Sequence, residues 1–131
     1  MKKQGVLHGE LSKVIAEMGY HDTIMVGDAS MPVPKGVDCI DLAVTRGVPE
    51  LTKVLEVILG ELNIASAIIC SEMEEESPAM KAKIEGLLGD VKVTEFLNEQ
   101  VMNLSKDCKV VVRTGEFTPF SSVILRAGRL F

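Results

Sequence analysis

The sequence predicts an α/β fold: a layered domain with a mostly parallel central sheet flanked by helices. Two observations carry this prediction. Segments with apolar residues at the helical spacing of three and four alternate along the chain with short apolar runs typical of strands. One run, 64–70, is apolar almost throughout, as expected of a strand covered on both faces. With 131 residues and neither linker nor repeat, the chain is expected to form a single domain over residues 1–131.

One helix and two strands are expected before residue 45. A stripe of apolar residues at helical spacing predicts the helix: Leu7, Leu11, Val14, Ile15 and Met18. Gly19 is expected to end it, because glycine commonly follows the last helical turn. A short buried strand over 23–27 is followed by a loop over 28–34, whose prolines hold it extended. The second strand is expected over 37–44.

The middle of the chain is expected to continue the alternation. Pro49 suits the first turn of a helix, and the apolar face of that helix continues to Leu62. The buried strand over 64–70 follows. The acidic segment 72–76 is expected in solvent, and 78–88 is expected to be helical.

Three strands and a short helix are expected in the last third. Residues 91–96 alternate like a half-buried strand. Asn98 is expected to cap a helix that runs to about residue 105. The final strands, 108–113 and 122–125, are the candidates for an antiparallel edge of the sheet.

Composition excludes several classes of protein. Hydrophobic residues make up 47% and charged residues 25%, as in an ordinary soluble domain. The net charge of −5 argues against a nucleic-acid or anionic-membrane partner, because phosphate binding needs clustered lysine and arginine. No apolar run approaches the ~18–20 residues of a membrane span, and the start of the chain has no signal-peptide pattern. We expect a cytoplasmic protein.

Neither a metal nor a cofactor is expected. Cys39, Cys70 and Cys108 are widely spaced without a CxxC pair, so neither disulfides nor a zinc site are indicated. Cys70 and Cys108 border apolar runs and are expected to be buried thiols. Two histidines are too few for a multi-histidine metal site. The phosphate-binding glycine motifs and the GxSxG elbow are absent.

Three polar residues near the first strand are candidates for chemistry. Asp28 follows that strand, where ligands bind in open α/β sheets; its carboxylate either binds a hydroxyl or orients a base, or only closes a turn. His21 follows the first helix, and imidazole suits proton transfer near neutral pH, although a surface loop histidine is the simpler interpretation. Tyr20 can donate a proton from its hydroxyl, but a tyrosine beside the end of a helix is usually a packing residue.

The end of the fifth strand and the turn that follows it offer two more candidates. Arg113 and Glu116 flank a Thr-Gly turn, so they either pair to lock the loop or support a sugar-sized pocket beside it. Asp38 and Asp41 lie near Arg46 in sequence and are expected to be structural.

With these residues in view, the chain resembles the D-ribose pyranase and fucose mutarotase family over essentially its whole length. The likeness is closest to the D-ribose pyranase branch. The segments that carry it are Met1–Leu7, Asp28-Ala-Ser-Met-Pro-Val-Pro34, Ile40–Val44, Gly47-Val-Pro49, Val112-Arg-Thr-Gly-Glu-Phe-Thr-Pro119 and the closing Ile124–Phe131.

The resemblance implies a cofactor-free isomerase acting on a free monosaccharide. Members interconvert the pyranose and furanose forms of D-ribose, or the anomers of related sugars. One group removes the proton of the anomeric hydroxyl while another protonates the ring oxygen, and the opened sugar closes again. The resemblance further implies a homo-oligomer, a pentamer or a decamer, with pockets at subunit contacts to which the C-terminus contributes.

The resemblance also proposes roles for individual residues. The expected catalytic residues are Tyr20, His21 and Asp28. The expected substrate-binding residues are Asp28, Asn98, Phe120, Ser121 and Ser122, and the expected supporting residues are Arg113 and Glu116. Several positions depart from the family pattern. Tyr20 replaces the family's histidine, Asn98 a second histidine and Met102 a lysine, and Phe120 and Ser122 replace a tyrosine and an asparagine.

These departures leave two hypotheses. In the first, the chain is an active sugar mutarotase or pyranase, in which Tyr20 donates a proton or His21 takes the acid/base role with Asp28 beside it. In the alternative, it is a catalytically impaired member that binds a monosaccharide or another small polar ligand as a sensor or assembly partner.

Overall fold

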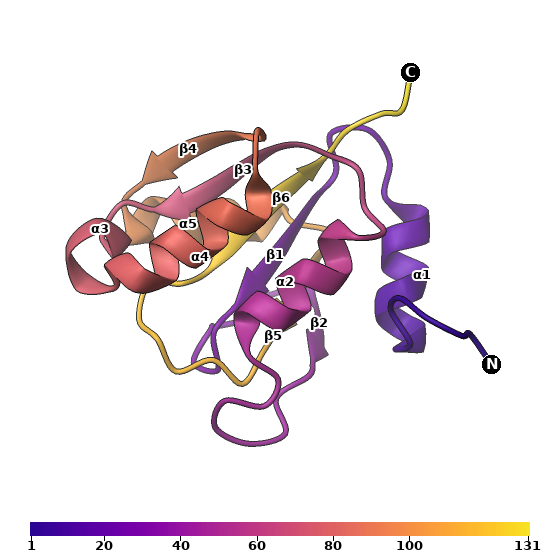
Figure 1. The fold of residues 1–131 in the computed structure, drawn as a ribbon, viewed down its shortest axis with the longest axis horizontal. Coiled ribbons are helices and arrows are strands. Elements are labelled where there is room, and N and C mark those ends of the chain that lie inside the picture. Colours follow the sequence, from indigo (N-terminus) through magenta and orange to yellow (C-terminus); the bar gives the residue numbers. More distant parts are fainter.

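A computed structural model describes residues 1–131 and contains one six-stranded sheet with helices on both faces (Figure 1). The strands are β1 Thr23–Gly27, β2 Asp38–Asp41, β3 Ile64–Cys70, β4 Lys92–Phe96, β5 Val110–Arg113 and β6 Val123–Ala127. Their order across the sheet is β2-β5-β1-β6-β3-β4. Only β6 runs against its neighbours β1 and β3. The predicted layered α/β fold with a mostly parallel sheet is therefore confirmed.

The expected antiparallel edge is wrong. Strand β6 lies inside the sheet between β1 and β3, while β5 pairs in parallel with β1 and β2. Buried side chains make up all but one position of β6, as a strand with a neighbour on each side requires. The apolar sequence of this segment predicts that the strand is buried, but it does not identify the distant strands that lie on either side of it.

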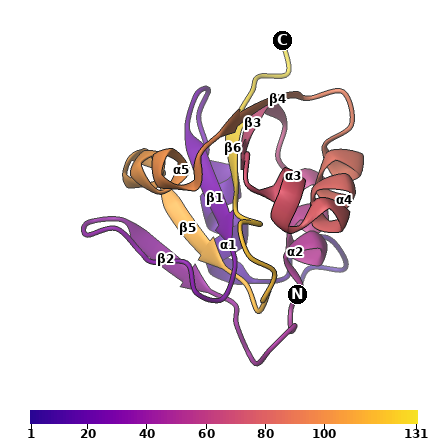
Figure 2. The ribbon, with the colours of Figure 1, turned by 90° about the vertical axis from the view of Figure 1, so that its left-hand side faces the viewer.

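The helices divide unequally between the two faces of the sheet. They are α1 Gly9–Glu17, α2 Leu51–Leu59, α3 Met73–Glu76, α4 Pro78–Leu88 and α5 Asn98–Leu104, followed by a 3₁₀ turn, Ser105–Asp107. Figure 2 shows α5 on one side of the sheet, opposite α2, α3 and α4. The core of 22 buried residues that includes α1, α2 and α4 is therefore the main one, and the cluster of seven near α5 is smaller. None of these helices is long and apolar enough to cross a membrane.

Helix α1 begins later and ends earlier than its apolar stripe suggests. The His8 imidazole accepts a hydrogen bond from the Leu11 amide at 3.2 Å and caps the helix, which leaves Leu7 outside it and exposed. The helix ends at Glu17, and Gly19 does not adopt a left-handed conformation. The left-handed residue is His21, with φ of 75°. The expected glycine stop is therefore wrong.

Strand β2 is shorter than the expected 37–44. It is an edge strand paired only with β5, whose last residue Arg113 lies opposite Asp41. Beyond that point the Asp41 carboxylate accepts from the Ala43 amide at 3.0 Å, which turns the chain away from the sheet. The strands 23–27 and 64–70 have the predicted bounds.

The ends of two helices also differ from expectation. Helix α2 begins at Leu51 and ends at Leu59, so Pro49 precedes its first turn. Asn98 is the first residue of α5 and not its cap. Its backbone amide donates to the Glu72 carboxylate at 2.9 Å, and the Gln100 side chain accepts from the Leu97 amide at 3.0 Å. Carboxylate and amide oxygens thus satisfy the open end of α5.

Glu61 ties the N-terminal segment to the main core. Its carboxylate accepts from the Val6 amide at 3.1 Å and contacts the Lys2 ammonium at 3.2 Å. The Val6 hydrogen bond, together with Lys2, lowers the pKa of Glu61. The resulting stabilisation is present above the ordinary carboxyl pKa and is lost as the pH falls through the lowered value.

We therefore expect Glu61→Gln to lower the thermal midpoint at pH 7, with a difference from the parent protein that shrinks in acid. Midpoints measured from about pH 7 down to about pH 3 check this. Glu56→Gln is the control, because Glu56 contacts only Lys53 on the exposed face of α2. A deficit for Glu61→Gln that stays constant with pH would contradict the explanation.

Candidate functional site

Most of the expected site residues gather at one edge of the sheet. Asp28 follows β1, Asn98 follows β4 and Arg113 ends β5. Because β6 runs in the opposite direction, the segment Phe120–Ser122 that precedes it reaches the same edge. The carboxyl ends of parallel strands are where open α/β sheets bind ligands.

A cavity of about 300 Å³ opens between the loops after β1 and β5, and this volume suits a small molecule. Its walls are Asp28, Ala29, Ser30, Glu116, Phe117, Thr118 and Pro119. The Ala29 amide donates to the Glu116 carbonyl at 2.8 Å, which joins the two loops. The Arg46 guanidinium lies over the ring of Phe117, one of the wall residues, at 4.8 Å.

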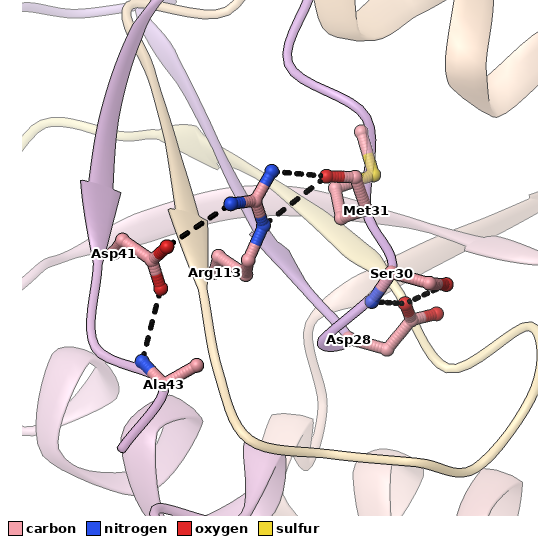
Figure 3. Close-up of polar contacts among 6 residues, drawn as sticks. All are labelled: Asp28, Ser30, Met31, Asp41, Ala43 and Arg113. Atoms are coloured by element: carbon pink, nitrogen blue, oxygen red, sulfur yellow. Dashed lines mark hydrogen bonds and ion pairs between the residues drawn. The ribbon is translucent and has the colours of Figure 1, made fainter. Parts of the chain in front are cut away.

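Asp28 both closes a turn and offers an oxygen to the cavity. Its Oδ1 accepts from the Ser30 amide at 2.8 Å and from the Ser30 hydroxyl at 2.7 Å (Figure 3). Its Oδ2 has no hydrogen-bond partner within the chain. The first oxygen fixes the carboxylate, so the second is held ready to accept a proton or a ligand hydroxyl.

Arg113 holds the loop that carries Asp28. Its Nη2 and Nε donate to the Met31 carbonyl at 2.8 and 3.3 Å, and its Nη1 pairs with Asp41 at 3.0 Å (Figure 3). Asp41 is thus structural, as expected. Each of the three guanidinium nitrogens thus donates to an oxygen of the protein, an arrangement consistent with the expected supporting role of Arg113.

The expected pair between Arg113 and Glu116 is wrong. Glu116 accepts from the Leu51 amide at 3.1 Å and from the Thr118 hydroxyl at 2.8 Å. Its carboxylate therefore lies at the amino end of α2, where negative charge is favourable. The intervening turn separates the two side chains, because Thr114 is buried and its hydroxyl donates to the Gly27 carbonyl at 2.9 Å.

The turn at Gly115 has no room for a side chain. A Cβ there would lie 2.6 Å from the carbonyl oxygens of Thr45 and Val48. We expect Gly115→Ala to destabilise the fold by about 1–3 kcal/mol, because the backbone of the 45–48 loop would have to move. Urea unfolding measures this. Gly86→Ala is the control: the same methyl on helix α4 meets no atom within 4 Å, so it is expected to be neutral or stabilising.

Phe120, Ser121 and Ser122 are largely used within the fold. The Ser121 hydroxyl donates to the Thr118 carbonyl at 2.9 Å, and the Ser122 hydroxyl contacts the Met31 sulfur at 3.9 Å. Both serines are buried, whereas Phe120 is half-buried and packs against both core clusters. Phe120 also has φ of 59°, a strained conformation of the kind that gathers at functional sites.

Tyr20 and His21 precede β1 and therefore lie at its other end. The turn between α1 and β1 passes beside the C-terminal segment (Figure 1). The His21 amide donates to the Ala127 carbonyl at 3.1 Å, and the Arg129 guanidinium lies 4.7 Å from the Tyr20 ring centre. The five residues of β1, about 13 Å of strand, separate this cluster from Asp28. The expectation that His21 has Asp28 beside it is therefore wrong within one chain.

Comparison with known proteins places this geometry in a family. The sequence model of the RbsD / FucU transport protein family matches residues 1–130. The chain belongs to this family. The resemblance described from the sequence alone is thereby confirmed, and it extends along the whole chain.

Several relatives align with the RbsD / FucU chain described here from end to end. It is 46% identical to the D-ribose pyranase of Coprothermobacter proteolyticus and 44% identical to that of Symbiobacterium thermophilum, in each case over 131 residues and 100% of both chains. The solved structure of Bacillus subtilis RbsD complexed with D-ribose superposes with a TM-score of 0.96 at 37% identity, covering 100% of both chains. A fucose mutarotase from Streptococcus pneumoniae, in complex with L-fucose, shares the fold with a TM-score of 0.80 at 23% identity.

Sequence reasoning missed two residues that contact Asn98 in the candidate site of this RbsD / FucU chain. Glu72 lies two residues after the end of β3 and accepts from the amide of Asn98, and the buried Cys70 thiol contacts the Asn98 side chain. Glu72 occupies the same kind of position as Asp28, just past a buried strand, and that signal could have found it. The neighbouring acidic residues 74–76 are exposed and concealed it.

Proposed function

We propose that this protein is a cofactor-free isomerase that interconverts the pyranose and furanose ring forms of D-ribose or a closely related monosaccharide. The principal support is the end-to-end likeness to D-ribose pyranases, at up to 46% identity among the relatives compared, combined with the TM-score of 0.96 to the RbsD solved with D-ribose. The fixed Asp28 carboxylate at a cavity of about 300 Å³ supports the same conclusion.

The chemistry needs one proton acceptor and one proton donor. The free Oδ2 of Asp28 accepts the proton of the anomeric hydroxyl, whose electrons form the aldehyde C=O as the bond from C1 to the ring oxygen breaks. A donor protonates that ring oxygen. Attack of a different hydroxyl on C1, with the protons returned, closes the other ring form. Side chains placed for such transfers contribute ~10²–10⁴-fold.

The donor is supplied by Tyr20 or His21 of a neighbouring subunit. Within one chain both lie about 13 Å or more from Asp28. Tyr20 is 48% exposed and lies against Arg129, and the following residues Leu130 and Phe131 are also exposed, so this end of the subunit is open to a neighbour. His21 is held in a strained left-handed conformation, as functional residues often are. The working form in this proposal is a homo-oligomer, a pentamer or a decamer.

A binding protein without catalysis is the second candidate. It is favoured by the use of the Ser121 and Ser122 hydroxyls inside the fold, which leaves fewer groups for sugar hydroxyls. An unsatisfied buried hydroxyl costs about 1–3 kcal/mol, so a less hydroxylated ligand would then be preferred.

NMR magnetisation exchange between the ring forms of D-ribose, with and without protein at neutral pH, tests the proposal. We expect cross-peaks that depend on the protein. Tyr20→Phe and His21→Ala then identify the donor, since the variant that lacks it should lose most of the rate. No acceleration by folded, oligomeric protein would overturn the enzyme and favour the binding protein, which calorimetry with pentoses and hexoses would then examine.

A further inference from the structure

The thiol of Cys70 lies against the side chain of Asn98. Cys70 ends β3 and is fully buried, and its Sγ donates to Oδ1 of Asn98 at 3.5 Å. Cys70 and Phe96 are opposite each other in the parallel β3–β4 pair, so the chain leaving β4 passes beside the thiol. The contact is therefore set by the register of two strands and not by a mobile loop.

The backbone of Asn98 is fixed separately. Its amide donates to both carboxylate oxygens of Glu72 at 2.9 Å. This carboxylate sits at the first turn of α5, where the helix dipole favours negative charge. Glu72 thus fixes the backbone of Asn98, and Cys70 fixes the Oδ1 atom of its side chain. Together these two contacts define the orientation of the side-chain amide.

The thiol is a hydrogen donor at neutral pH. Burial, with the charges of Glu72 and Asp28 adding to it, raises the pKa of Cys70 to about 12. A protonated thiol needs an acceptor, and only Oδ1 of the Asn98 amide is one. Strands β1 and β3 run in the same direction with only β6 between them, so Cys70 and the amide beside it lie at the same end of the sheet as Asp28, the proposed base.

We infer that Cys70 is a positioning residue, which together with Glu72 turns the Asn98 amide so that its Nδ2 hydrogens face the hydroxyl oxygens of the bound sugar. No atom of the chain accepts a hydrogen bond from Nδ2, so both hydrogens are available. Asn98 then acts only as a donor to the substrate. The inference rests on the proposed ring-exchange function, because that function supplies the sugar.

Cys70→Ala and Cys70→Ser test the inference by kinetics. With Cys70→Ala we expect the D-ribose concentration at half-maximal exchange to rise about two- to tenfold, the value of one hydrogen bond, while kcat changes little. Cys70→Ser keeps a donor and should recover part of the loss. Cys108→Ala is the matched control: it removes a buried thiol from the same core cluster, but that thiol faces the Leu104 carbonyl. An equal effect of Cys108→Ala, or a fall in kcat alone, would overturn the positioning role.

A second readout does not depend on the sugar. In ¹H–¹⁵N NMR spectra of the free protein, the side-chain NH₂ signals of Asn98 can be assigned by their loss in Asn98→Asp. We expect Cys70→Ala to shift these signals and Cys108→Ala to leave them in place. Absence of ring exchange by the parent protein would refute the proposed function, whereas unmoved Asn98 signals in Cys70→Ala would refute the positioning of Asn98.

Discussion

Replacing Asp28 with asparagine is expected to lower the rate of D-ribose ring exchange by about 10²–10⁴-fold, the usual contribution of a positioned proton-transfer group. The amide oxygen of asparagine can still accept from the Ser30 amide and hydroxyl, which are 2.8 and 2.7 Å from Oδ1 in the parent protein. The turn is therefore kept while the second oxygen is replaced by a group that accepts no proton. The loss should fall on kcat more than on sugar binding.

Asp38→Asn is the matched control for this substitution. Asp38 is exposed at the start of the edge strand β2, and its side chain makes no hydrogen bond in the chain. The same change in charge there should leave ring exchange at the parent rate. NMR exchange with equal concentrations of folded protein gives both rates. If Asp28→Asn kept full activity with an unchanged melting temperature, Asp28 would not be the proton acceptor.

The position of Asp28 could be predicted from sequence because a local rule decides it. The apolar run 23–27 ends at a polar residue followed by a proline-rich loop, and the structure has the strand over the same residues. A run bounded in this way needs no distant information. The strand over 64–70 was predicted for the same reason.

The interactions around Asp28 could not be predicted, because they depend on pairings far apart in the chain. Arg113 reaches Asp41 only because β2 and β5 pair in parallel with those residues opposite each other. Its expected partner Glu116 is nearer in sequence, but the buried Thr114 turn directs Glu116 to the amino end of α2. Nearness in the sequence therefore did not identify which charged side chains form an ion pair.

The same limit applies to Tyr20 and His21. Their motif is close to Asp28 in the sequence, so a shared site looked natural. An intervening strand, however, carries the chain from one end of the sheet to the other, and β1 does so here. The sequence contains both halves of the proposed site, whereas their meeting depends on assembly, which the pattern of a single chain does not describe.

Assembly leads to the second large effect. We expect two inactive variants, Asp28→Asn and the double variant Tyr20→Phe with His21→Ala, to recover activity when their subunits are mixed by coexpression. Each site in this proposal takes Asp28 from one subunit and the donor from the next, a head-to-tail arrangement of the kind that closes rings. Random assembly of equal amounts leaves about a quarter of the sites with both groups intact, so about a quarter of the parent rate should return.

A companion mixture distinguishes the two site geometries independently. All three substitutions are placed in one chain, and that chain is coexpressed in equal amount with the parent protein. A site shared between subunits again retains both groups in about a quarter of cases, whereas a site within one subunit retains them in about half. Recovery to a quarter in the first mixture together with a quarter in the second requires the shared site. No recovery in the first mixture with half activity in the second would place the whole reaction within one subunit, and the 13 Å of strand β1 would then have to be bridged by a movement of the α1–β1 turn.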